Sequence, residues 1–188
     1  VIKVVEEVML QFNKEIIDAL EKKKCKSAPI NIKENNAIYV KQKSIELGYV
    51  GFPDKIDTKI ILNFIKEDFI PVITPMGVDN KQQIYNINAD TAAGALAINL
   101  KSRRLLLMTD VEGVYDKEKK LISELKPSDA ENLIYNDTIQ EGMIPKVRTC
   151  INCINNGVKG VVIIDGRKSH SILFELFSDQ GSGTLIRK

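Results

Sequence analysis

The sequence has only one histidine and three cysteines, and their scarcity excludes several kinds of chemistry. His170 has no second histidine as a fellow metal ligand, and no serine or cysteine has a plausible histidine partner for nucleophilic catalysis. Cys150 and Cys153 have the spacing of half a zinc or redox site, but no second cysteine pair completes it. An odd number of cysteines, in a lysine-rich chain without a signal peptide, favours reduced thiols. We expect two thiols on a helix face and no metal site, with a redox or metal role as the alternative.

Long apolar runs and a strong charge of either sign are also missing. The longest apolar runs, residues 105–108 and 161–164, have strand length and are too short to span a membrane. The formal net charge of +2 is too small to indicate a nucleic-acid partner. With 188 residues, of which 44% are hydrophobic, the chain can bury one substantial core. We therefore expect a soluble, cytoplasmic protein with a single α/β unit over residues 1–188 and no nucleic-acid or membrane partner.

Three common catalytic motifs are absent from the sequence. It has no G-x-S-x-G elbow of a serine hydrolase and no G-x-x-x-x-G-K-[ST] phosphate loop. It also has no G-x-G-x-x-G dinucleotide fingerprint, and its Gly181-Ser182-Gly183 segment precedes a predicted strand instead of a helix. The sequence therefore lacks the motifs that acyl transfer and hydride transfer need.

The informative part of the sequence is the stretch YNINADTAAGALA, residues 85–97. It begins as a short alternating strand and continues as a run of small apolar residues that is typical of a packed helix. Asp90 and Thr91 lie at the predicted helix start, as N-cap or first turn, where side-chain oxygens can accept hydrogen bonds from backbone N–H groups. Asn86, Asn88 and Asp90 recur at every second position, so an extended strand would direct them to one face. We interpret this face as the floor of a polar site, with a well-capped packing helix as the alternative.

Strand and helix patterns alternate along the remaining chain. The predicted helices are residues 3–24, 57–68 (capped by Asp57), 128–135 (capped by Ser128), 147–156 and 170–177. The predicted strands are residues 27–32, 37–40, 69–74 (buried), 84–87, 105–109, 121–125, 161–164 and a final edge strand after Gly183. Turn signals at residues 34–36 predict a hairpin or two edge strands, and Asp79-Asn80 predicts a second hairpin. The pattern predicts an α/β fold with an open, mainly parallel sheet sandwiched by helices.

Three loops that follow predicted strands or precede helices carry the polar residues. They are residues 86–90, 110–116 and 142–146, and parallel strands would bring such loops to one edge of a sheet. They offer an aspartate at a helix start, a glycine-containing loop with apolar walls, and Lys146 beside a proline. This set favours phosphoryl transfer, which needs positioning and positive charge more than covalent catalysis. We expect Lys146 to supply the charge and Asp90 to orient it across a terminal phosphate; an unspecified α/β ligand-binding domain remains the alternative.

Four stretches resemble the N-acetylglutamate kinases of the amino-acid kinase superfamily. They are residues 85–97, TDVEGVY (109–115), GMIPK (142–146) and IDGR (164–167), in the order and spacing of that family. The resemblance covers nearly the whole chain and implies the carboxyl-terminal two-thirds of the amino-acid kinase fold. It also implies transfer of the γ-phosphoryl group of ATP to the side-chain carboxylate of N-acetyl-L-glutamate, the second step of arginine biosynthesis.

The resemblance assigns roles to the matching positions. It implies that Asn86 and Asn88 bind acetylglutamate, that Asp90 orients catalytic lysines, and that Lys146 stabilises the transferring phosphoryl group. Magnesium would arrive with ATP and bridge its phosphates. The resemblance further implies nucleotide binding by Asp110, Val111, Glu112, Gly113, Val114, Tyr115, Thr138, Ile139 and Gln140.

The sequence departs from the family in several places. The family's amino-terminal segment, with a phosphate-binding lysine, a Gly-Gly substrate loop and a substrate arginine, has no counterpart here. We therefore expect residues 1–90 to form the rest of a substrate-binding half and residues 91–188 the nucleotide-binding half. Glu175 and Gly181 match positions of the arginine site in arginine-inhibited members, although Val162 replaces their usual histidine.

The resemblance leaves two alternatives open. The first is another phosphotransferase of the same superfamily, acting on aspartate, carbamate or a nucleoside monophosphate. The second is a non-catalytic module that binds nucleotide or L-arginine. For the protein itself, the resemblance implies a homodimer or a higher homo-oligomer.

Overall fold

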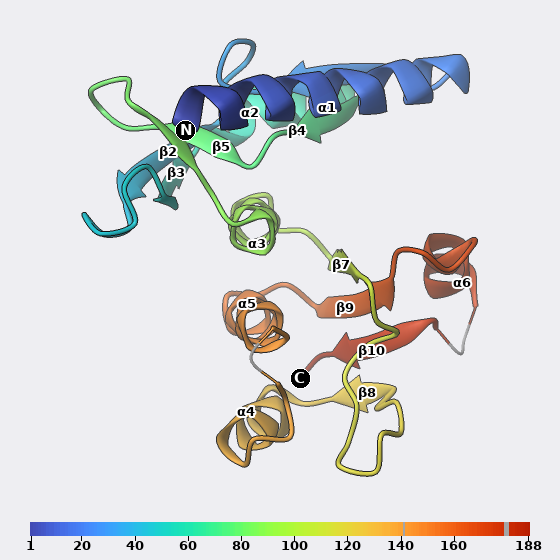
Figure 1. Ribbon diagram of the computed structural model, residues 1–188. Helices are drawn as coiled ribbons and strands as arrows, with labels where there is room; N and C mark the ends of the chain where they lie inside the picture. The colour runs from blue at the N-terminus through green and yellow to red at the C-terminus, as the bar shows by residue number, and fades with distance from the viewer. Residues whose placement is uncertain (141, 179–180) are drawn as a thin grey trace. The chain divides into compact units, whose positions relative to one another are not determined.

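The computed structural model describes residues 1–140, 142–178 and 181–188 (Figure 1). The chain divides into two compact units, Val1–Leu96 and Ala97–Lys188, and the division falls inside α3. The helices are α1 (Ile2–Lys22), α2 (Thr58–Lys66), α3 (Ala89–Asn99), α4 (Pro127–Tyr135), α5 (Ile144–Asn155) and α6 (Ser171–Phe177). The strands are β1 (Ser27–Ile30), β2 (Ile38–Gln42), β3 (Gly51–Ile56), β4 (Ile70–Ile73), β5 (Met76–Val78), β6 (Ile84–Asn86), β7 (Arg104–Thr109), β8 (Glu124–Leu125), β9 (Gly160–Asp165) and β10 (Gly183–Ile186).

The first unit contains a parallel pair of strands covered by helices. β1 pairs with β4, α1 contacts both strands, and α2 contacts β4. The carboxylate of Asp57 accepts a hydrogen bond from the Lys59 N–H at 3.1 Å, which confirms the predicted cap of α2. The sequence predicts a buried β4, but this prediction is wrong: Ile70 is 45% exposed and the other three residues of the strand are only partly buried.

A second sheet of the first unit has the order β3-β2-β5-β6. The hairpin predicted at Asp79 is confirmed, since β5 and β6 are antiparallel and the Asp79 carboxylate accepts hydrogen bonds from the Lys81 and Gln83 N–H groups. β1 and β2 form neither a hairpin nor two edge strands, because β2 lies between β3 and β5. The Asn31 side chain accepts hydrogen bonds from Lys33 and Glu34 N–H groups, and this turn ends β1 before β2 begins.

The stretch from β6 to α3 turns from strand to helix earlier than its alternating pattern predicts. β6 ends at Asn86 and α3 begins at Ala89, so Asn86, Asn88 and Asp90 do not share one face of an extended strand. The Asn88 Oδ1 accepts hydrogen bonds from the Thr91 N–H at 3.0 Å and from the Thr91 hydroxyl at 3.2 Å. Asn88 is therefore the cap, and Asp90 lies in the first turn. There its negatively charged carboxylate interacts favourably with the positive end of the helix dipole.

The second unit is built on a sheet of order β7-β9-β10-β8. β7 and β9 are parallel, with Thr109 opposite Asp165, whereas β10 is antiparallel to β9 and parallel to β8. Every residue of β9 is buried, and α5 and α6 both contact this strand. β10 is therefore an interior strand rather than the predicted edge strand, because both of its sides find partners far away in the sequence.

Two helix starts in the second unit differ from the sequence pattern. α4 begins at Pro127 after Lys126, so Ser128 lies inside the helix and does not cap it. Proline is favourable at this position because its missing N–H has no helical partner there. α5 begins at Ile144, so Lys146 belongs to the first helical turn instead of the preceding loop.

Cys150 and Cys153 lie on the inner face of α5, and both side chains are fully buried. Burial raises the pKa of Cys153 to about 11. Within residues 1–140, 142–178 and 181–188, no group of three or more His, Cys, Asp and Glu side chains could hold a metal ion.

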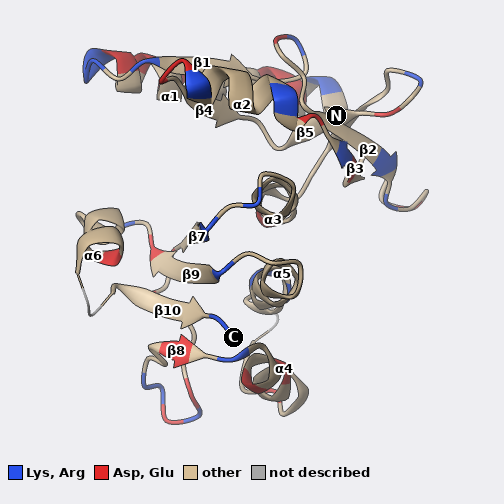
Figure 2. Ribbon diagram, turned by 180° about the vertical axis from the view of Figure 1, so that it is seen from behind, with Lys and Arg blue, Asp and Glu red and all other residues tan. Residues whose placement is uncertain are grey.

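Charged residues of both signs are spread over both units (Figure 2). Lysine and arginine are interspersed with aspartate and glutamate along the ribbon of each unit (Figure 2). Among the described residues, no helix has both the length and the apolar character that crossing a membrane requires.

Candidate functional site

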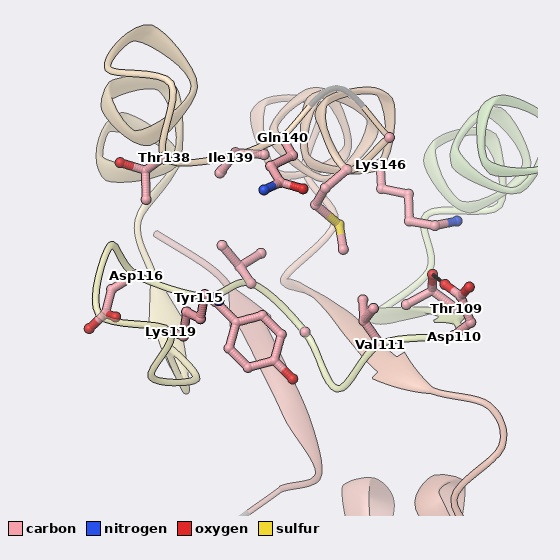
Figure 3. Close-up of a pocket in the computed structure, with 14 residues that line it drawn as sticks. Thr109, Asp110, Val111, Tyr115, Asp116, Lys119, Thr138, Ile139, Gln140 and Lys146 are labelled. Atoms are coloured by element: carbon pink, nitrogen blue, oxygen red, sulfur yellow. Dashed lines mark hydrogen bonds between the residues drawn. The ribbon is translucent and has the colours of Figure 1, made fainter.

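A cavity of about 660 Å³ opens in the second unit, where β7 ends (Figure 3). Its size lies in the range of small-molecule and cofactor sites. Three segments form its wall: the loop after β7, the connection from α4 to α5, and the first turn of α5. The lining residues are Thr109, Asp110, Val111, Gly113, Val114, Tyr115, Asp116, Lys119, Thr138, Ile139, Gln140, Gly142, Met143 and Lys146.

The parallel strands β7 and β9 position the first wall. Their carboxyl ends meet at one edge of the sheet, where the Gly166 N–H donates a hydrogen bond to the Thr109 carbonyl at 2.8 Å. The chain then leaves β7 at Asp110, whose carboxylate accepts a hydrogen bond from the Thr109 hydroxyl at 3.3 Å. This is the edge at which open α/β sheets bind ligands.

The loop after β7 is a compact turn that its own polar groups stabilise. The Asp116 carboxylate accepts hydrogen bonds from the N–H groups of Glu118 and Lys120, at 2.8 and 2.9 Å. Val114 is buried, and together with Val111 it gives this wall an apolar surface. The side chain of Glu112 does not line the cavity; its carboxylate accepts a hydrogen bond from the Tyr115 hydroxyl at 3.3 Å.

The connection from α4 to α5 forms the opposite wall. The Thr138 N–H donates a hydrogen bond to the Asn136 side chain, and Ile139 is buried. The Gln140 carbonyl accepts hydrogen bonds from the N–H groups of Met143 and Ile144, at 2.9 and 3.2 Å, which ties this connection to the start of α5.

Lys146 brings positive charge to the cavity from the first turn of α5. In the view of Figure 3, Lys146 and Asp110 lie at one end of the cavity, and Thr138 and Asp116 lie at the other. The amino-terminal end of a helix carries partial positive charge, so α5 adds to the field of the Lys146 ammonium group. This end of the cavity is suited to an anion such as a phosphate.

The structure brings together nine of the ten residues assigned to the nucleotide or to the transferring phosphoryl group in the second unit. The exception is Glu112. Four further lining residues lie in stretches that the sequence pattern singled out but had no role assigned to them: Thr109, Asp116, Gly142 and Met143. Lys119 lies outside those stretches, in the same turn as Asp116.

The residues expected at the substrate belong to the first unit. Asn86 is the last residue of β6 and is half-buried, Asn88 is exposed, and Asp90 is intermediate in burial. Because Asp90 and Lys146 belong to different units, their arrangement across a phosphate stays a prediction.

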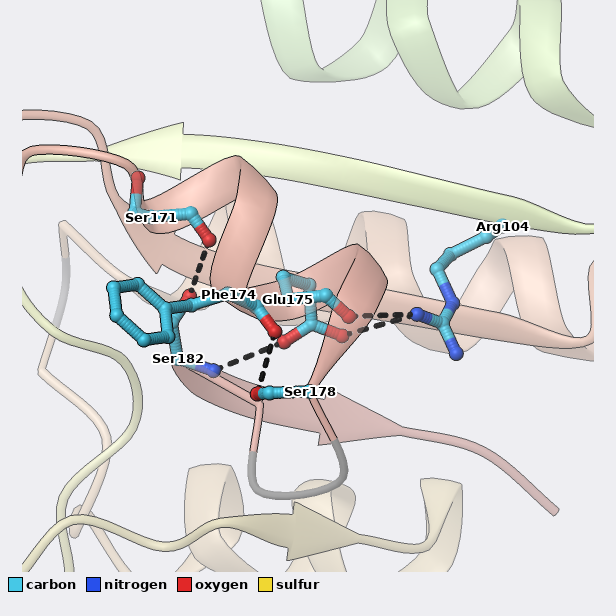
Figure 4. Close-up of polar contacts among 6 residues, drawn as sticks. All are labelled: Arg104, Ser171, Phe174, Glu175, Ser178 and Ser182. Atoms are coloured by element: carbon cyan, nitrogen blue, oxygen red, sulfur yellow. Dashed lines mark hydrogen bonds and ion pairs between the residues drawn. The ribbon is translucent and has the colours of Figure 1, made fainter.

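Glu175 belongs to α6 (Figure 4), and Gly181 lies close to its carboxylate. The buried Glu175 carboxylate lies 3.3 Å from Nη1 of Arg104 and accepts a hydrogen bond from the Ser182 N–H at 3.1 Å. Gly181 has a φ of +66°, and a Cβ atom on it would lie 2.9 Å from Oε2 of Glu175. The candidate arginine-site carboxylate therefore already binds a guanidinium group of the chain itself.

Comparison with known proteins gives close relatives in sequence. The chain is 54% identical to the acetylglutamate kinase of Pelagibacter ubique over 187 residues, which cover all of this chain and 65% of that protein. It is also 54% identical to the acetylglutamate kinase of Afipia carboxidovorans over 147 residues, which cover 78% of this chain and 50% of that protein. The chain thus spans between half and two-thirds of the length of these relatives, and the predicted resemblance is confirmed.

Solved structures share the fold at lower identity. An N-acetylglutamate synthase from Neisseria gonorrhoeae, complexed with coenzyme A and N-acetyl-glutamate, has a TM-score of 0.85 and 21% identity, covering 97% of this chain and 43% of that chain. The isopentenyl phosphate kinase of T. acidophilum has a TM-score of 0.67 and 18% identity, covering 98% of this chain and 70% of that chain. The predicted α/β fold with mainly parallel sheets flanked by helices is therefore confirmed.

The family assignment rests on a match over most of the chain. The sequence model of the amino acid kinase family matches residues 1–165, from α1 to the end of β9. Together with the sequence relatives, this match shows that the chain belongs to the amino acid kinase family.

Proposed function

We propose that this chain is part of an acetylglutamate kinase, which converts ATP and N-acetyl-L-glutamate into ADP and N-acetyl-L-glutamyl 5-phosphate. The observation that carries the proposal is the cavity after β7, whose wall presents Lys146 at a helix start. The 54% identity to acetylglutamate kinases over the whole chain supports the choice of substrate.

In the proposed reaction, a side-chain carboxylate oxygen of acetylglutamate forms a bond to the γ-phosphorus of ATP. The bond from that phosphorus to the β–γ bridging oxygen breaks, and ADP leaves with the electron pair. Negative charge spreads over the transferring phosphoryl oxygens during this step. The Lys146 ammonium group and the amino-terminal end of α5 would stabilise that charge from one end of the cavity.

The rest of the cavity fits a nucleotide. Val111, Val114 and Ile139 offer apolar contacts to a base, while Thr138 and Gln140 offer polar groups to its edge or to a ribose. Magnesium would enter with ATP, coordinated by phosphate oxygens, and would neutralise part of the phosphate charge.

The first unit would supply the acetylglutamate contacts. Asn86 and Asn88 carry amide donors that suit the substrate's carboxylate and acetyl oxygens. The Oδ1 of Asn88 already caps α3, so only its amide NH₂ group is suited to bind substrate. Asp90, in the first turn of α3, would orient the lysine that meets the phosphates.

Two binding measurements and one assay test this proposal. Calorimetry with MgATP should give a dissociation constant in the range of a specific site. In the assay, ADP release should require N-acetyl-L-glutamate and should not occur with L-aspartate, carbamate or a nucleoside monophosphate as the acceptor. The assay is performed on this chain and on a chimaera that carries the amino-terminal portion of the Pelagibacter ubique kinase. Binding of L-arginine without binding of MgATP would instead favour a non-catalytic module.

Regulation by L-arginine at Glu175 and Gly181 is a second proposal, and one observation supports it. The Glu175 carboxylate binds the Arg104 guanidinium group, so its geometry suits the functional group of arginine. Free L-arginine would have to share or displace Arg104. Replacing Arg104 with methionine should therefore increase the affinity for L-arginine in calorimetry, and an unchanged or weaker affinity would contradict the proposal.

We also propose a cytoplasmic homo-oligomer. An apolar stripe on α1, formed by Val4, Val8, Phe12 and Ile16, is 36–62% exposed and suits a contact with another copy. Light scattering should give at least a dimer for the wild type and a smaller species for Phe12→Glu. A monomeric wild type would contradict the proposal.

A further inference from the structure

The hydroxyl group of Thr184, on β10, joins the two ends of the turn that forms one wall of the cavity. Its Oγ1 accepts a hydrogen bond from the Val114 N–H at 2.8 Å and donates one to the Ile122 carbonyl at 2.6 Å. The Ile122 N–H in turn donates to the Val114 carbonyl at 2.8 Å. Thr184 is fully buried, so water does not replace its hydroxyl in these bonds.

We propose that Thr184 is a positioning residue for the nucleotide pocket. It does not line the cavity, but it fixes Val114, which does, and through Val114 it holds the loop in the form that receives a ligand. The statement that this ligand is a nucleotide rests on the proposed function. The statement that Thr184 holds the loop rests on the hydrogen bonds alone.

The backbone around the hydroxyl is shaped to receive it. At Gly113, which lines the cavity, a Cβ atom would collide with the Thr184 Oγ1 and would lie 2.9 Å from Cδ1 of Leu121. A glycine is therefore needed where the loop passes over Thr184. The close approach fixes the loop on β10 by packing as well as by hydrogen bonding.

Strand pairing and a set of polar contacts determine where Thr184 lies. We call these contacts, among Arg104, Ser171, Glu175 and Ser182, the polar clamp. β10 pairs with β9, with Thr184 opposite Ile163, and a Cβ atom on Gly183 would collide with the Ile163 carbonyl. Two residues before Thr184, the Ser182 N–H is bound by the Glu175 carboxylate.

The polar clamp extends from this point to α6 and β7. The Arg104 guanidinium group binds both the carboxylate and the backbone carbonyl of Glu175, at 3.3 and 3.1 Å (Figure 4). The Ser182 hydroxyl donates to the Ser171 carbonyl at 3.0 Å. The clamp bond at Ser182 thus lies two positions before Thr184, with Gly183 between them.

A hydroxyl is needed at position 184 because valine has the same shape but cannot bind either backbone group. In Thr184→Val, the Val114 N–H and the Ile122 carbonyl lose their side-chain partner inside the protein. The loop should then open to find water. Thr184→Ser keeps the hydroxyl and loses only a methyl group, so it is the matched control.

Amide hydrogen exchange on the ligand-free protein tests the positioning role directly. In the wild type the Val114 amide should be protected, and in Thr184→Val it should exchange at least about tenfold faster, which corresponds to the loss of one hydrogen bond. Thr184→Ser should stay near the wild type. Equal protection of the Val114 amide in the wild type and in Thr184→Val would overturn the inference. An unprotected Val114 amide in the wild type would also overturn it, and that measurement does not depend on the folding of any variant.

Binding and kinetics then test the link to the nucleotide. Thr184→Val should weaken MgATP binding and raise the KM for ATP by about tenfold, with smaller changes in kcat and in the KM for acetylglutamate, and Thr184→Ser should restore the values. A merely structural role would lower the active fraction and leave both KM values unchanged, which would overturn the inference. If the wild type binds no MgATP, the proposed function fails, while amide exchange still decides whether Thr184 holds the loop.

Discussion

The carboxylate of Asp165 binds the guanidinium group of Arg167 through two parallel hydrogen bonds, Nε to Oδ1 and Nη2 to Oδ2, each 3.0 Å long. The Arg167 N–H adds a third bond to Oδ1 at 2.9 Å. This arrangement closes the turn after β9 beside the carboxyl end of β7, so it supports the edge of the sheet at which the cavity opens. The side-chain and backbone bonds from Arg167 hold the pKa of Asp165 below its ordinary value of 3.8.

The depressed pKa predicts how stability depends on pH. The ionised Asp165 carboxylate stabilises the folded state fully above its unfolded pKa, and this contribution is lost as the pH falls through the lower folded pKa. Asp165→Asn should therefore be less stable than the wild type at pH 7, and the difference should shrink below about pH 4. Chemical denaturation at several pH values measures this difference, and a gap that widens on acidification would contradict the assignment.

Breaking the clamp at α6 should destabilise the second unit. Arg104→Met removes the guanidinium group that binds the buried Glu175 carboxylate, while the Ser182 N–H still donates to that carboxylate. The change should cost about 1–3 kcal/mol in the free energy of unfolding. Glu175→Gln and the double variant complete a double-mutant cycle, in which a coupling energy near zero would show that the pair does not act together.

Asn88 has two separable roles, one in the fold and one proposed in substrate binding. Asn88→Ala removes the cap of α3 and should cost about 1 kcal/mol, whereas Asn88→Asp keeps an oxygen acceptor and should retain most of that stability. Both variants lose the amide donor, so both should raise the KM for acetylglutamate. If Asn88→Asp leaves that KM unchanged, Asn88 is only a cap.

Lys146 is expected to act in phosphoryl transfer rather than in folding. Lys146→Ala should lower kcat by about 10²–10³-fold, because it removes positive charge that stabilises the transition state, and the thermal midpoint should change little. Lys159→Ala, at an exposed position outside the cavity, is the matched control. A near-normal rate in Lys146→Ala would remove this residue from the mechanism.

The three cysteines should differ in reactivity. Cys25 is partly exposed, whereas Cys150 and Cys153 are fully buried and the pKa of Cys153 is raised to about 11. A thiol reagent at pH 8 should therefore modify one cysteine in the native protein and all three in denaturant. Rapid modification of Cys150 or Cys153 in the native protein would contradict this burial.

Much of the local structure could be predicted from the sequence, because it depends on neighbouring residues. The cap of α2 at Asp57 and the hairpin at Asp79 both use hydrogen bonds between residues no more than four positions apart. The loops that carry the predicted nucleotide residues were also identified, since each follows a strand or precedes a helix. Asp90 lies in the first turn of α3, one of the two positions predicted for it, and Asn88 is the cap. The predicted cap of α4 was wrong, because Pro127 rather than Ser128 sets the start of that helix.

The sequence by itself determined most of the helices and strands, although not β3 or β5, together with the polar loops and the family resemblance. The tertiary structure decided which distant segments meet: β10 became an interior strand, Thr184 met Val114 across 70 positions, and Arg104 met Glu175 across 71. The physical reason is that helix periods and turn bonds are local, whereas the partner of a strand or of a buried hydroxyl depends on how the whole core packs.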